Sequence, residues 1–364
     1  MPSGESRAHA GACSIGRTLW AVLPGGIDDP AAPSGGNRYD RTVLDLLAAG
    51  DRAAAVPARP LHEVPLAGSW PTPGAAARAA LHRALSDIPD GATVLLDGLV
   101  ACGVPELLEP HARRLRLAIL VHLPLSDETG LPATEAAAVR AREGRALRLA
   151  AKVVATSAAA ADRLRALHEL AGREIAVVEP GVDPAPLAVP EPSGHRLLCV
   201  AAVTPRKGQD LLVGVLERHL AELRWTCTFV GALVRPVPFT HPGIRFVGPL
   251  TGRDLDAAYA RADLLVLPSR AETYGMVVTE ALARGLPVLA AAVGGVPDAL
   301  GTAGGERPGI LVPPDDPVAL AAALRSWLTG DALRERLRAA ARARRATLRT
   351  WARTARRLSE VLEE

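Results

Sequence analysis

Two glutamates in the stretch AETYGMVVTEALARG stand eight positions apart and are both candidates to bind a polar ligand. Glu272 falls in a predicted loop after an apolar strand, and Glu280 falls in the second turn of the helix that follows. The helix begins with residues whose free backbone N–H groups favour an anion or a hydroxyl-rich ligand: Tyr274, Gly275 and Met276. Carboxylates accept hydrogen bonds from pairs of sugar hydroxyls. The segment fits a ligand with two sugars flanking phosphate, whereas the plainer alternative is a helix with a surface glutamate.

A second segment, CVAAVTPRKGQDLL, reads as a strand, a turn rich in Pro and Gly, and a helix. Arg206 and Lys207 lie in this turn, where cations reach a diphosphate. Lys207 is also unusual in composition, because the chain contains only one other lysine, Lys152. We predict that this turn and the glutamate segment serve the same ligand.

Two further positions follow predicted strands in the amino-terminal half. Gly35 and Gly36 in PSGGNRYD allow a close backbone approach to a ligand, and Asn37 is expected to cap the next helix. A capped helix after a glycine turn explains these residues equally well. His122 ends the apolar run of ILVHLPL, where either a structural role or a ligand-binding role fits.

Composition and charge exclude several classes of protein. The 364 residues are 49% hydrophobic and carry a net charge of +3, which is typical of a globular chain without a strong field for nucleic acid. The four cysteines lack metal-ligand spacing, and no P-loop, HExxH motif or nucleophile elbow occurs. Asp254 and Asp256 form a D-x-D, but they fit the acidic first turn of a helix. We expect no metal, no resident cofactor and no nucleic-acid partner.

The sequence also indicates where in the cell the protein is expected. No apolar run has the length of a membrane span. The arginine-rich tail at 331–364 predicts amphipathic helices whose leucines and Trp351 pack on the body of the protein. Attachment of this tail to a membrane surface is the alternative. We expect a cytoplasmic protein and leave peripheral membrane contact open.

Short apolar runs alternate with helical stretches throughout the chain, which is typical of parallel sheets covered by helices. The runs that predict strands are TLWAVLP, ATVLLDG, LRLAILVHL, AKVVATS, EIAVVEP, RLLCVAAV, WTCTFVG, GIRFVG, ADLLVLPS, LPVLAAA and GILVPP. Between residues 178 and 196, proline and glycine accumulate and periodicity is lost, which indicates a linker. The sequence predicts an α/β fold of two doubly wound, Rossmann-like domains that face a cleft.

The stretch SRAETYGMVVTEALARGLPVLAAAVGGVPDAL closely resembles the signature, with its two glutamates, of the retaining family 4 glycosyltransferases of the GT-B architecture. Five other stretches match the same family in order: VTPRKGQDLL, EPGVD, RFVGPLTGRDLDAAYARADLLVLPS, GILVPPDDP and TWARTARRL. The resemblance covers nearly the whole chain and is strongest from about residue 178 onward. In the amino-terminal half it depends on PSGGNRYD, VH and VVATS.

The resemblance implies a role for each matching residue. Glu280 corresponds to the glutamate that binds the ribose, and Glu272 to the glutamate that contacts the transferred sugar. Lys207 corresponds to the lysine that binds the diphosphate. Gly36 matches the amino-terminal glycine loop, and His122 matches the histidine near the reacting sugar.

The resemblance also implies a domain plan. After a disordered leader at 1–16, it places an acceptor-side domain at 17–184 and a nucleotide-sugar-binding domain at 185–345. The remaining residues, 346–364, form a helix that packs back toward the first domain.

The implied activity is that of a retaining, hexosyltransferase-type enzyme. It moves a sugar from a nucleoside-diphosphate sugar to an acceptor, which is a small molecule, a glycan or a lipid. One departure is Ala202, where family members often carry an arginine; Arg206 is the residue that could replace it. Two alternatives are an epimerase or phosphorylase on the same architecture, and a nucleotide-sugar-binding protein with impaired catalysis.

Overall fold

The computed structural model describes residues 18–29, 33–128, 132–170 and 172–364, so the predicted leader at 1–16 lies outside the described residues. The chain forms two compact units. The first consists of the residues up to Asp29 with Ser34–Glu179 and Trp351–Glu364, and the second consists mainly of Pro180–Thr350. The chain therefore returns to its first unit for its last helix.

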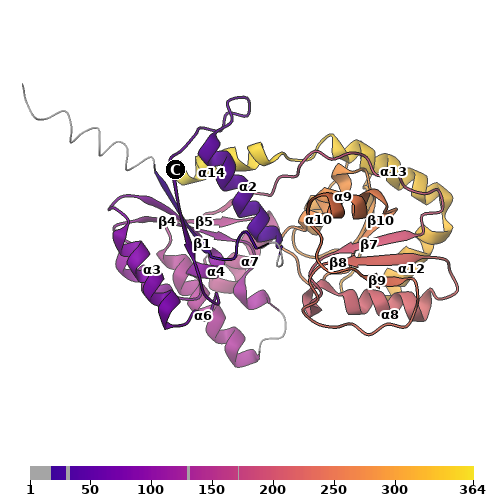
Figure 1. Cartoon of the computed structure of the whole chain (residues 1–364), viewed down its shortest axis with the longest axis horizontal. Coiled ribbons are helices and arrows are strands. Elements are labelled where there is room, and N and C mark those ends of the chain that lie inside the picture. The colour runs from indigo at the N-terminus through magenta and orange to yellow at the C-terminus, as the bar shows by residue number, and fades with distance from the viewer. Residues whose placement is uncertain (1–17, 30–32, 129–131, 171) are drawn as a thin grey trace, which may run out of the picture. The chain divides into compact units, whose positions relative to one another are not determined.

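The first unit is built on a parallel six-stranded sheet with the strand order β2-β1-β3-β4-β5-β6 (Figure 1). Its strands are β1 (Leu19–Pro24), β2 (Leu61–Leu66), β3 (Thr93–Asp97), β4 (Arg116–Val121), β5 (Lys152–Ala155) and β6 (Ile175–Val177). All five residues of β3 and the last five of β4 are buried. Such continuous apolar runs are typical of central parallel strands with helices on both faces.

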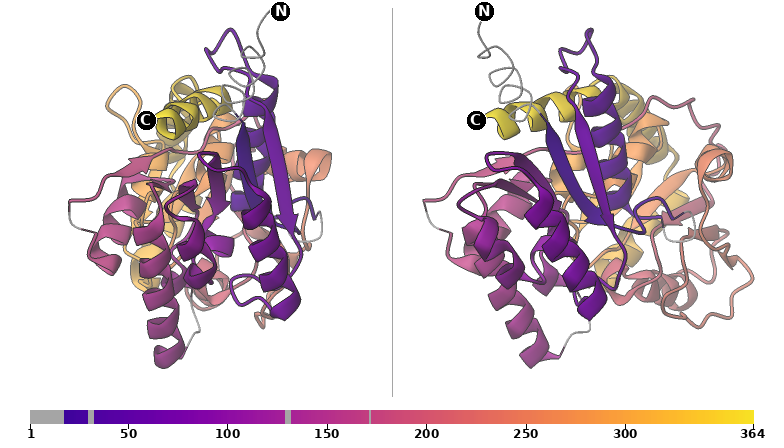
Figure 2. Two further views of the ribbon diagram at one scale, coloured as in Figure 1. Left: turned by 90° about the vertical axis from the view of Figure 1, so that its left-hand side faces the viewer. Right: turned by 60° about the vertical axis from the view of Figure 1, so that its left-hand side comes forward.

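Strand β2 was not predicted from the sequence. Its residues LHEVPL include charged and polar side chains and a proline, and His62 and Glu63 are exposed. It pairs only with β1, at the edge of the sheet, and the right-hand view of Figure 2 shows the two strands side by side. An edge strand tolerates proline and polar residues, which removes the apolar signal used to recognise strands.

Helices cover both faces of this sheet. They are α2 (Gly35–Ala49), α3 (Ala75–Asp87), α4 (Gly98–Ala101), α5 (Pro105–Leu108), α6 (Ala133–Leu149), α7 (Ala158–His168) and α14 (Trp351–Glu363). Helix α14 packs on α2, and it buries Trp351 and Leu358 in doing so. The apolar face of the last helix of the predicted tail is thus covered within the first unit, whereas α13 (Asp331–Arg345) belongs to the second unit.

The second unit contains another parallel six-stranded sheet, with the order β12-β11-β10-β7-β8-β9. Its strands are β7 (Arg196–Val200), β8 (Thr226–Val230), β9 (Ile244–Phe246), β10 (Leu264–Leu267), β11 (Val288–Ala291) and β12 (Gly309–Val312). Its helices are α8 (Gln209–His219), α9 (Gly252–Ala260), α10 (Met276–Ala283), α11 (Val296–Leu300), α12 (Pro317–Thr329) and α13 (Asp331–Arg345). The prediction of an α/β fold with two doubly wound sheets is confirmed.

The order of strands contains one reversal in each sheet. In the first unit the chain moves from β1 outward to β2 and then returns to place β3 on the other side of β1. In the second unit it moves from β7 through β8 to β9 and returns to place β10 beside β7. The loops after the two strands at such a reversal separate and leave a crevice, where ligands of doubly wound sheets bind.

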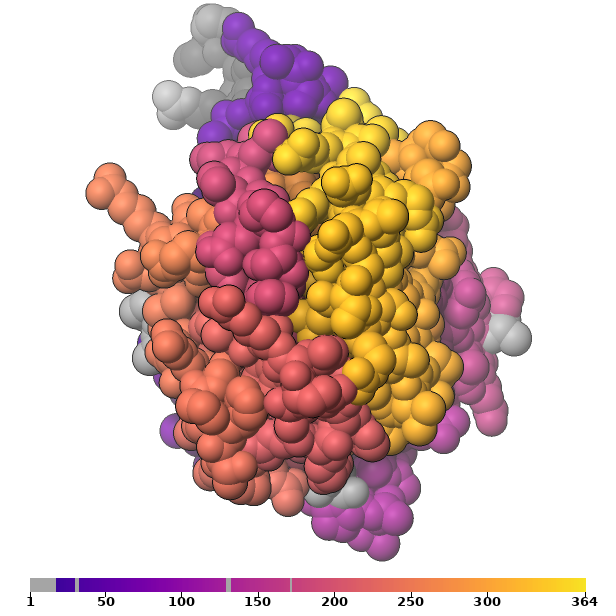
Figure 3. All heavy atoms as spheres, turned by 90° about the vertical axis from the view of Figure 1, so that its right-hand side faces the viewer, coloured from indigo at the N-terminus to yellow at the C-terminus, as the bar shows by residue number. Residues whose placement is uncertain are grey.

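The linker between the units is fastened to the second unit. Arg334 and Arg338 of α13 donate hydrogen bonds to the carbonyls of Pro192 and Glu191, and Figure 3 shows this part of the linker along α13.

Among the helices of the described ranges, none has both the length and the apolar character needed to cross a bilayer.

Asp263 fixes the point at which the linker enters the sheet. Its carboxylate is fully buried and accepts hydrogen bonds from the backbone N–H of Glu191 at 2.7 Å and of Arg196 at 2.9 Å. The guanidinium of Arg196 donates to both of its oxygens, at 2.9 and 3.2 Å. One side chain at the start of β10 thus holds the start of β7 and the residues before it.

We expect Asp263→Asn to destabilise the second unit by roughly 3 kcal/mol, because an amide nitrogen replaces an acceptor and leaves Arg196 without its buried counter-charge. Hydrogen exchange at the amides of β7 and β10 measures this loss for the unit itself. Asp298→Asn, at an exposed position of the same unit, is the control and should change stability by less than about 0.5 kcal/mol. Equal effects of the two substitutions would contradict the assignment.

Candidate functional site

The loops after β7 and β10 meet at the reversal of the second sheet, and they bring two predicted site residues together. Lys207 lies in a short 3-10 turn, Pro205–Lys207, and Glu272 lies in the loop before α10. The Nζ atom of Lys207 donates to Oε1 of Glu272 at 2.6 Å. Their side chains are only 18% and 7% exposed, so this is a largely desolvated ion pair.

The surroundings keep Glu272 ionised. Burial alone raises the pKa of this carboxyl, but the charge and hydrogen bond of Lys207, with smaller contributions from Arg206 and Ser269, lower it below its ordinary value. The Ser269 hydroxyl donates to the same oxygen at 2.8 Å. The result is a carboxylate whose direction is fixed by two donors.

Arg206 lies beside this pair. Its Nη1 atom donates to the carbonyl of Ala271 at 3.2 Å, and its charge contributes to lowering the pKa of Glu272. The backbone at Ala202, the position where an arginine was expected, is bonded instead by the side chain of Gln209. Two cationic side chains of one turn therefore face the loop that carries Glu272.

The turn and the loop also touch through their backbones. Gly208, which follows Lys207, has a φ of 70°, and a Cβ atom there would lie 2.2 Å from the carbonyl oxygen of Pro268. Only glycine permits this approach. The backbone N–H of Arg270 donates to the carbonyl of Arg206 at 2.8 Å. The spacing between the cations and Glu272 is thus set by main-chain contacts.

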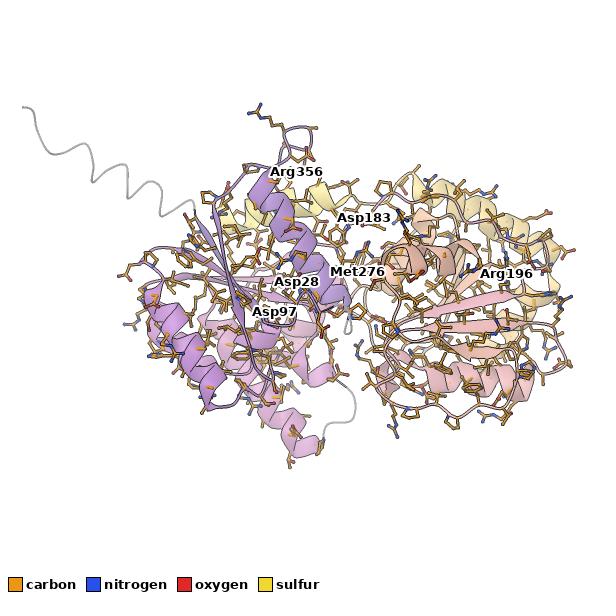
Figure 4. The ribbon with its side chains drawn as sticks, viewed as in Figure 1. Asp28, Asp97, Asp183, Arg196, Met276 and Arg356 are labelled. Atoms are coloured by element: carbon orange, nitrogen blue, oxygen red, sulfur yellow. The ribbon has the colours of Figure 1, made fainter. Side chains whose placement is uncertain are left out.

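Helix α10 begins slightly later than the sequence suggested. Tyr274 and Gly275 were predicted as its first residues, but Met276 is the first, and Gly275 is the cap with a left-handed φ of 87°. No side chain supplies a capping hydrogen bond at this end. Figure 4 labels Met276 at the first turn of α10. Despite this shift, the free backbone N–H groups of the first turn of α10 still belong to residues close to Glu272 in the chain.

Glu280 lies in the second turn of α10 and is 7% exposed. Its Oε2 atom accepts a hydrogen bond of 2.8 Å from the hydroxyl of Tyr259, a fully buried residue of α9. Arg284 lies over the Tyr259 ring at 4.5 Å and donates to the Glu280 carbonyl at 2.9 Å. Glu280 is therefore a buried carboxylate whose orientation is fixed by the hydrogen bond from Tyr259. The alternative of a surface glutamate is wrong.

Sequence reasoning missed Arg270, which joins three loops of this site. Its guanidinium makes two bonds to Asp210 of α8, at 2.8 and 2.9 Å, and one of 2.6 Å to Asp315 after β12. Nothing in the stretch PSRAE marks this arginine among the many in the chain. Its partners are 60 and 45 residues away in sequence, so only the fold identifies them.

The first unit brings together two other predicted residues. The imidazole of His122, just after β4, lies against Gly36 of α2, where an added Cβ would be 3.1 Å from its Cδ2 atom. Gly35 is the exposed first residue of the same helix. The close backbone approach predicted for the glycine pair is thus, at Gly36, an approach to His122.

The prediction that Asn37 caps α2 is wrong. Ser34 is the cap, and its hydroxyl accepts a hydrogen bond of 3.0 Å from the backbone N–H of Asn37. The Asn37 side chain donates instead to the carbonyl of Gly26. Serine and asparagine cap helices about equally well, so the sequence did not separate the two.

Two aspartates that the sequence analysis did not select surround His122. Asp40 of α2 bonds to Nε2 of His122 at 2.7 Å, and Asp97 ends β3. Within the described residues, these three side chains form the one group of this kind with atoms close enough to hold a metal ion. The expected absence of a metal stays a prediction.

The chain thus has two doubly wound units. In one of them, paired cations and a carboxylate lie beside a helix start at the sheet reversal. Together these features define the GT-B class of architecture. The fold agrees with solved structures. Sucrose-phosphate synthase from Thermosynechococcus elongatus has a TM-score of 0.73 at 21% identity, covering 95% of this chain and 98% of that one. Anabaena Alr3699/HepE, solved in complex with UDP-glucose, has a TM-score of 0.68 at 18% identity, covering 95% and 99%.

Residues 194–330 match the family described as glycosyl transferases group 1, and the resemblance to family 4 glycosyltransferases of GT-B architecture is confirmed for family and fold. D-inositol 3-phosphate glycosyltransferase of Kineococcus radiotolerans is 35% identical over 249 residues, which are 56% of this chain and 57% of that protein. The chain spans about half the length of the curated relatives it matches.

We expect Lys207→Met to destabilise the second unit by about 3 kcal/mol at pH 7, because it leaves the Glu272 carboxylate buried without its partner. The double variant Lys207→Met/Glu272→Gln should recover more than half of this loss. Hydrogen exchange at β7 and β10 is the measurement. The pKa of Glu272 is lowered in the folded protein, so its contribution is present above about pH 4.3 and is lost as the pH falls through the lowered value.

The loss caused by Lys207→Met should therefore shrink as the pH falls from 7 toward 4. Lys152→Met removes the other lysine, which lies in the first unit and pairs with Glu364 at 3.5 Å. It should leave the second unit unchanged. A loss at Lys207→Met that does not depend on pH would show that the Glu272 carboxylate is not its cause.

Proposed function

We propose that this protein is a glycosyltransferase that takes a sugar from a nucleoside-diphosphate sugar and transfers it, with retention at the anomeric carbon, to an acceptor. The second unit binds the donor and the first unit contributes the acceptor side. The observation that carries the proposal is the buried Lys207–Glu272 pair at the reversal of a doubly wound sheet, next to the start of α10.

The chemistry of sugar transfer explains why these groups lie together. Breaking the glycosidic bond to the diphosphate leaves positive charge on the sugar and negative charge on the departing phosphate. Lys207 and Arg206, with the N–H groups of the first turn of α10, supply positive charge for the diphosphate. Glu272 accepts hydrogen bonds from hydroxyls of the transferred sugar, and Glu280 accepts them from the ribose.

Tyr259 gives Glu280 a defined orientation. Because its hydroxyl donates to Oε2, the carboxylate is held in one rotamer by a buried neighbour and meets the ribose without a further loss of side-chain freedom. Arg206 takes the part of the arginine expected at position 202, since it lies in the same turn as Lys207 and acts on the same carboxylate.

Known proteins support this proposal. Relatives named D-inositol 3-phosphate glycosyltransferase match about half of their length, and Anabaena Alr3699/HepE was solved with UDP-glucose. UDP-glucose is therefore the first donor to test, followed by other nucleoside-diphosphate sugars. Titration calorimetry identifies the donor, and release of nucleoside diphosphate with and without an added acceptor measures turnover.

With the donor identified, we expect Lys207→Ala to lower turnover about 100-fold, because it removes a charge that stabilises the leaving phosphate. Glu280→Gln should weaken donor binding by about tenfold or more with a smaller effect on turnover, since a ribose hydrogen bond to a charged acceptor is lost. Glu272→Ala should lower turnover as strongly as Lys207→Ala. The quantities compared are kcat, KM and the calorimetric Kd.

Matched controls separate these effects from general damage. Lys152→Ala removes the other lysine, and Glu335→Gln changes an exposed glutamate of α13 in the unit that contains Glu280. Both should leave donor binding and turnover within about twofold of the wild type. Unchanged turnover in all three site variants would remove the assignment, and tight donor binding without any turnover would favour a binding protein with impaired catalysis.

The proposed retention rests on the family resemblance, with a route in which the leaving phosphate oxygen takes the proton of the acceptor on the same face of the sugar. An α-linked donor should then give an α-linked product. Methanol at moderate concentration serves as a surrogate acceptor, and the anomeric proton coupling of the methyl glycoside reports the configuration. A β-linked product would contradict this route, and a new nucleotide sugar formed without any acceptor would indicate an epimerase.

A further inference from the structure

Three titratable side chains lie together at the sheet reversal of the first unit. Asp97 ends β3, Asp40 lies in the second turn of α2, which follows β1, and His122 follows β4. One ligand atom from each lies within 4.8 Å of the others. Asp40 and Asp97 are 4% and 7% exposed, whereas the His122 side chain is 19% exposed. The set is thus buried at its carboxylate end and partly accessible at its imidazole end.

The hydrogen bonds within this set leave one buried atom unexplained. Oδ1 of Asp40 is bonded to Nε2 of His122 at 2.7 Å. Oδ2 of Asp40 is buried and has no hydrogen-bond partner in the part of the chain that the structure describes. Asp97 accepts the backbone N–H of Leu99 at 2.5 Å through Oδ1. A buried carboxylate oxygen without a donor is costly, and so are two ionised carboxylates side by side.

One proton resolves both costs. We propose that Asp97 is held protonated and donates to Oδ2 of Asp40, so that Asp40 in turn fixes His122 as an imidazolium that offers its Nδ1–H to an oxygen of the substrate. Asp40 and Asp97 are positioning residues in this arrangement, and His122 is the group that meets the ligand. The ligand part of the statement rests on the proposed function, whereas the protonation part does not.

The geometry assigns the tautomer as well as the charge. An ionised carboxylate only accepts hydrogen bonds, so Nε2 of His122 carries the proton that faces Asp40. If His122 were neutral, Nδ1 would be an acceptor; in the imidazolium, Nδ1 is a donor. The state of the two aspartates therefore decides whether this position donates to a sugar or phosphate oxygen or only accepts from a sugar hydroxyl.

The directions of the pKa shifts agree with this arrangement. Burial, followed by the charge of Asp40, raises the pKa of Asp97 to about 7. Burial lowers the pKa of His122, but the charge and hydrogen bond of Asp40 and the charge of Asp97 outweigh it and raise the value to about 9. Below about pH 7 the whole set is intact. Above it, Asp97 ionises and loses its bond to Asp40.

The other groups packed around His122 add no competing charge. Tyr39 of α2 approaches it edge to face at 5.2 Å, and Gly36 lies against its ring. On the β3 side, Cys102 is the further titratable group near Asp97, and burial raises the pKa of its thiol well above the ordinary value. The charge on His122 is thus governed by the two aspartates.

Nuclear magnetic resonance of protein with 15N-labelled histidine tests the arrangement without any substrate. His122→Gln identifies the signal of His122 among the nine histidines. In the wild type, we expect His122 to be about 90% imidazolium at pH 8, as a pKa near 9 requires. Asp40→Asn removes the accepting carboxylate, and at pH 8 the His122 signal should become that of a neutral ring.

Asp97→Asn provides the sharper test, because an amide is uncharged and can still donate to Oδ2 of Asp40. His122 should stay an imidazolium at pH 7 in this variant, and the wild-type change in its signal near pH 7 should disappear. Asp97→Ala removes the donor, and its effect on the His122 signal should exceed that of Asp97→Asn. Donor turnover followed against pH should fall above about pH 9 in the wild type, where His122 loses its charge, and should fall at a lower pH in Asp97→Asn, which lacks the charge of Asp97.

Two results would overturn the proposal. A wild-type His122 that titrates near 6.5 would show that Asp40 does not hold it charged. Broadening of the His122 signal by micromolar Mn²⁺, lost in Asp40→Asn, would show that a divalent cation occupies the place assigned to the proton. Failure of the proposed function appears differently: the resonance results would stand while no nucleotide sugar binds.

Discussion

The structure of the second unit depends on a charge pair that is expensive to bury. Removing Lys207 and Glu272 from water costs several kcal/mol per ion, and their attraction offsets this only if the geometry is good and the remaining donors and acceptors are satisfied. Those conditions are met by Ser269 and by a contact of 2.6 Å between the ions. Apolar residues of similar size would fill the same space at lower cost. Stability alone therefore does not account for the pair, and the proposed donor, which carries both phosphates and sugar hydroxyls, gives a reason for it.

Strand order is the constraint that places this pair. The turn with Lys207 and the loop with Glu272 are 65 residues apart in sequence, and they meet because β10 lies beside β7. Strand order brings distant residues together in the first unit as well. Asp97 follows β3, Asp40 lies on the helix after β1, and these two strands are neighbours at the reversal of their sheet. Each unit thus gathers charged groups where its chain changes direction across the sheet.

The sequence predicted what depends on local pattern and missed what depends on strand order. Apolar runs predicted every strand except β2, whose edge position tolerates His62 and Pro65. Lys207, Glu272 and Glu280 were found because glycine, proline and rare residue types mark their segments. Asp40 and Asp97 carried no such mark.

The reasons differ for the two aspartates. Asp40 lies within an ordinary amphipathic helix, and Asp97 looks like the polar end of a buried strand. Their meeting with His122 follows from pairing β3 with both β1 and β4, and no pattern in a single sequence encodes that pairing. Arg270 was missed for the same reason, because its partners lie on α8 and on the loop after β12.

The return of the chain to its first unit connects the last helix to the histidine site. Tyr39 of α2 lies edge to face with His122 on one side, at 5.2 Å, and with Trp351 of α14 on the other, at 5.8 Å. Its hydroxyl donates to the carbonyl of Val178, and Thr354 of α14 donates to that of Glu179. Both carbonyls belong to the stretch where the chain leaves the unit. Helix α14 therefore fixes the position of α2, and through Tyr39 it limits the space in which the His122 ring can turn; the residues that order this site come from the whole length of the chain.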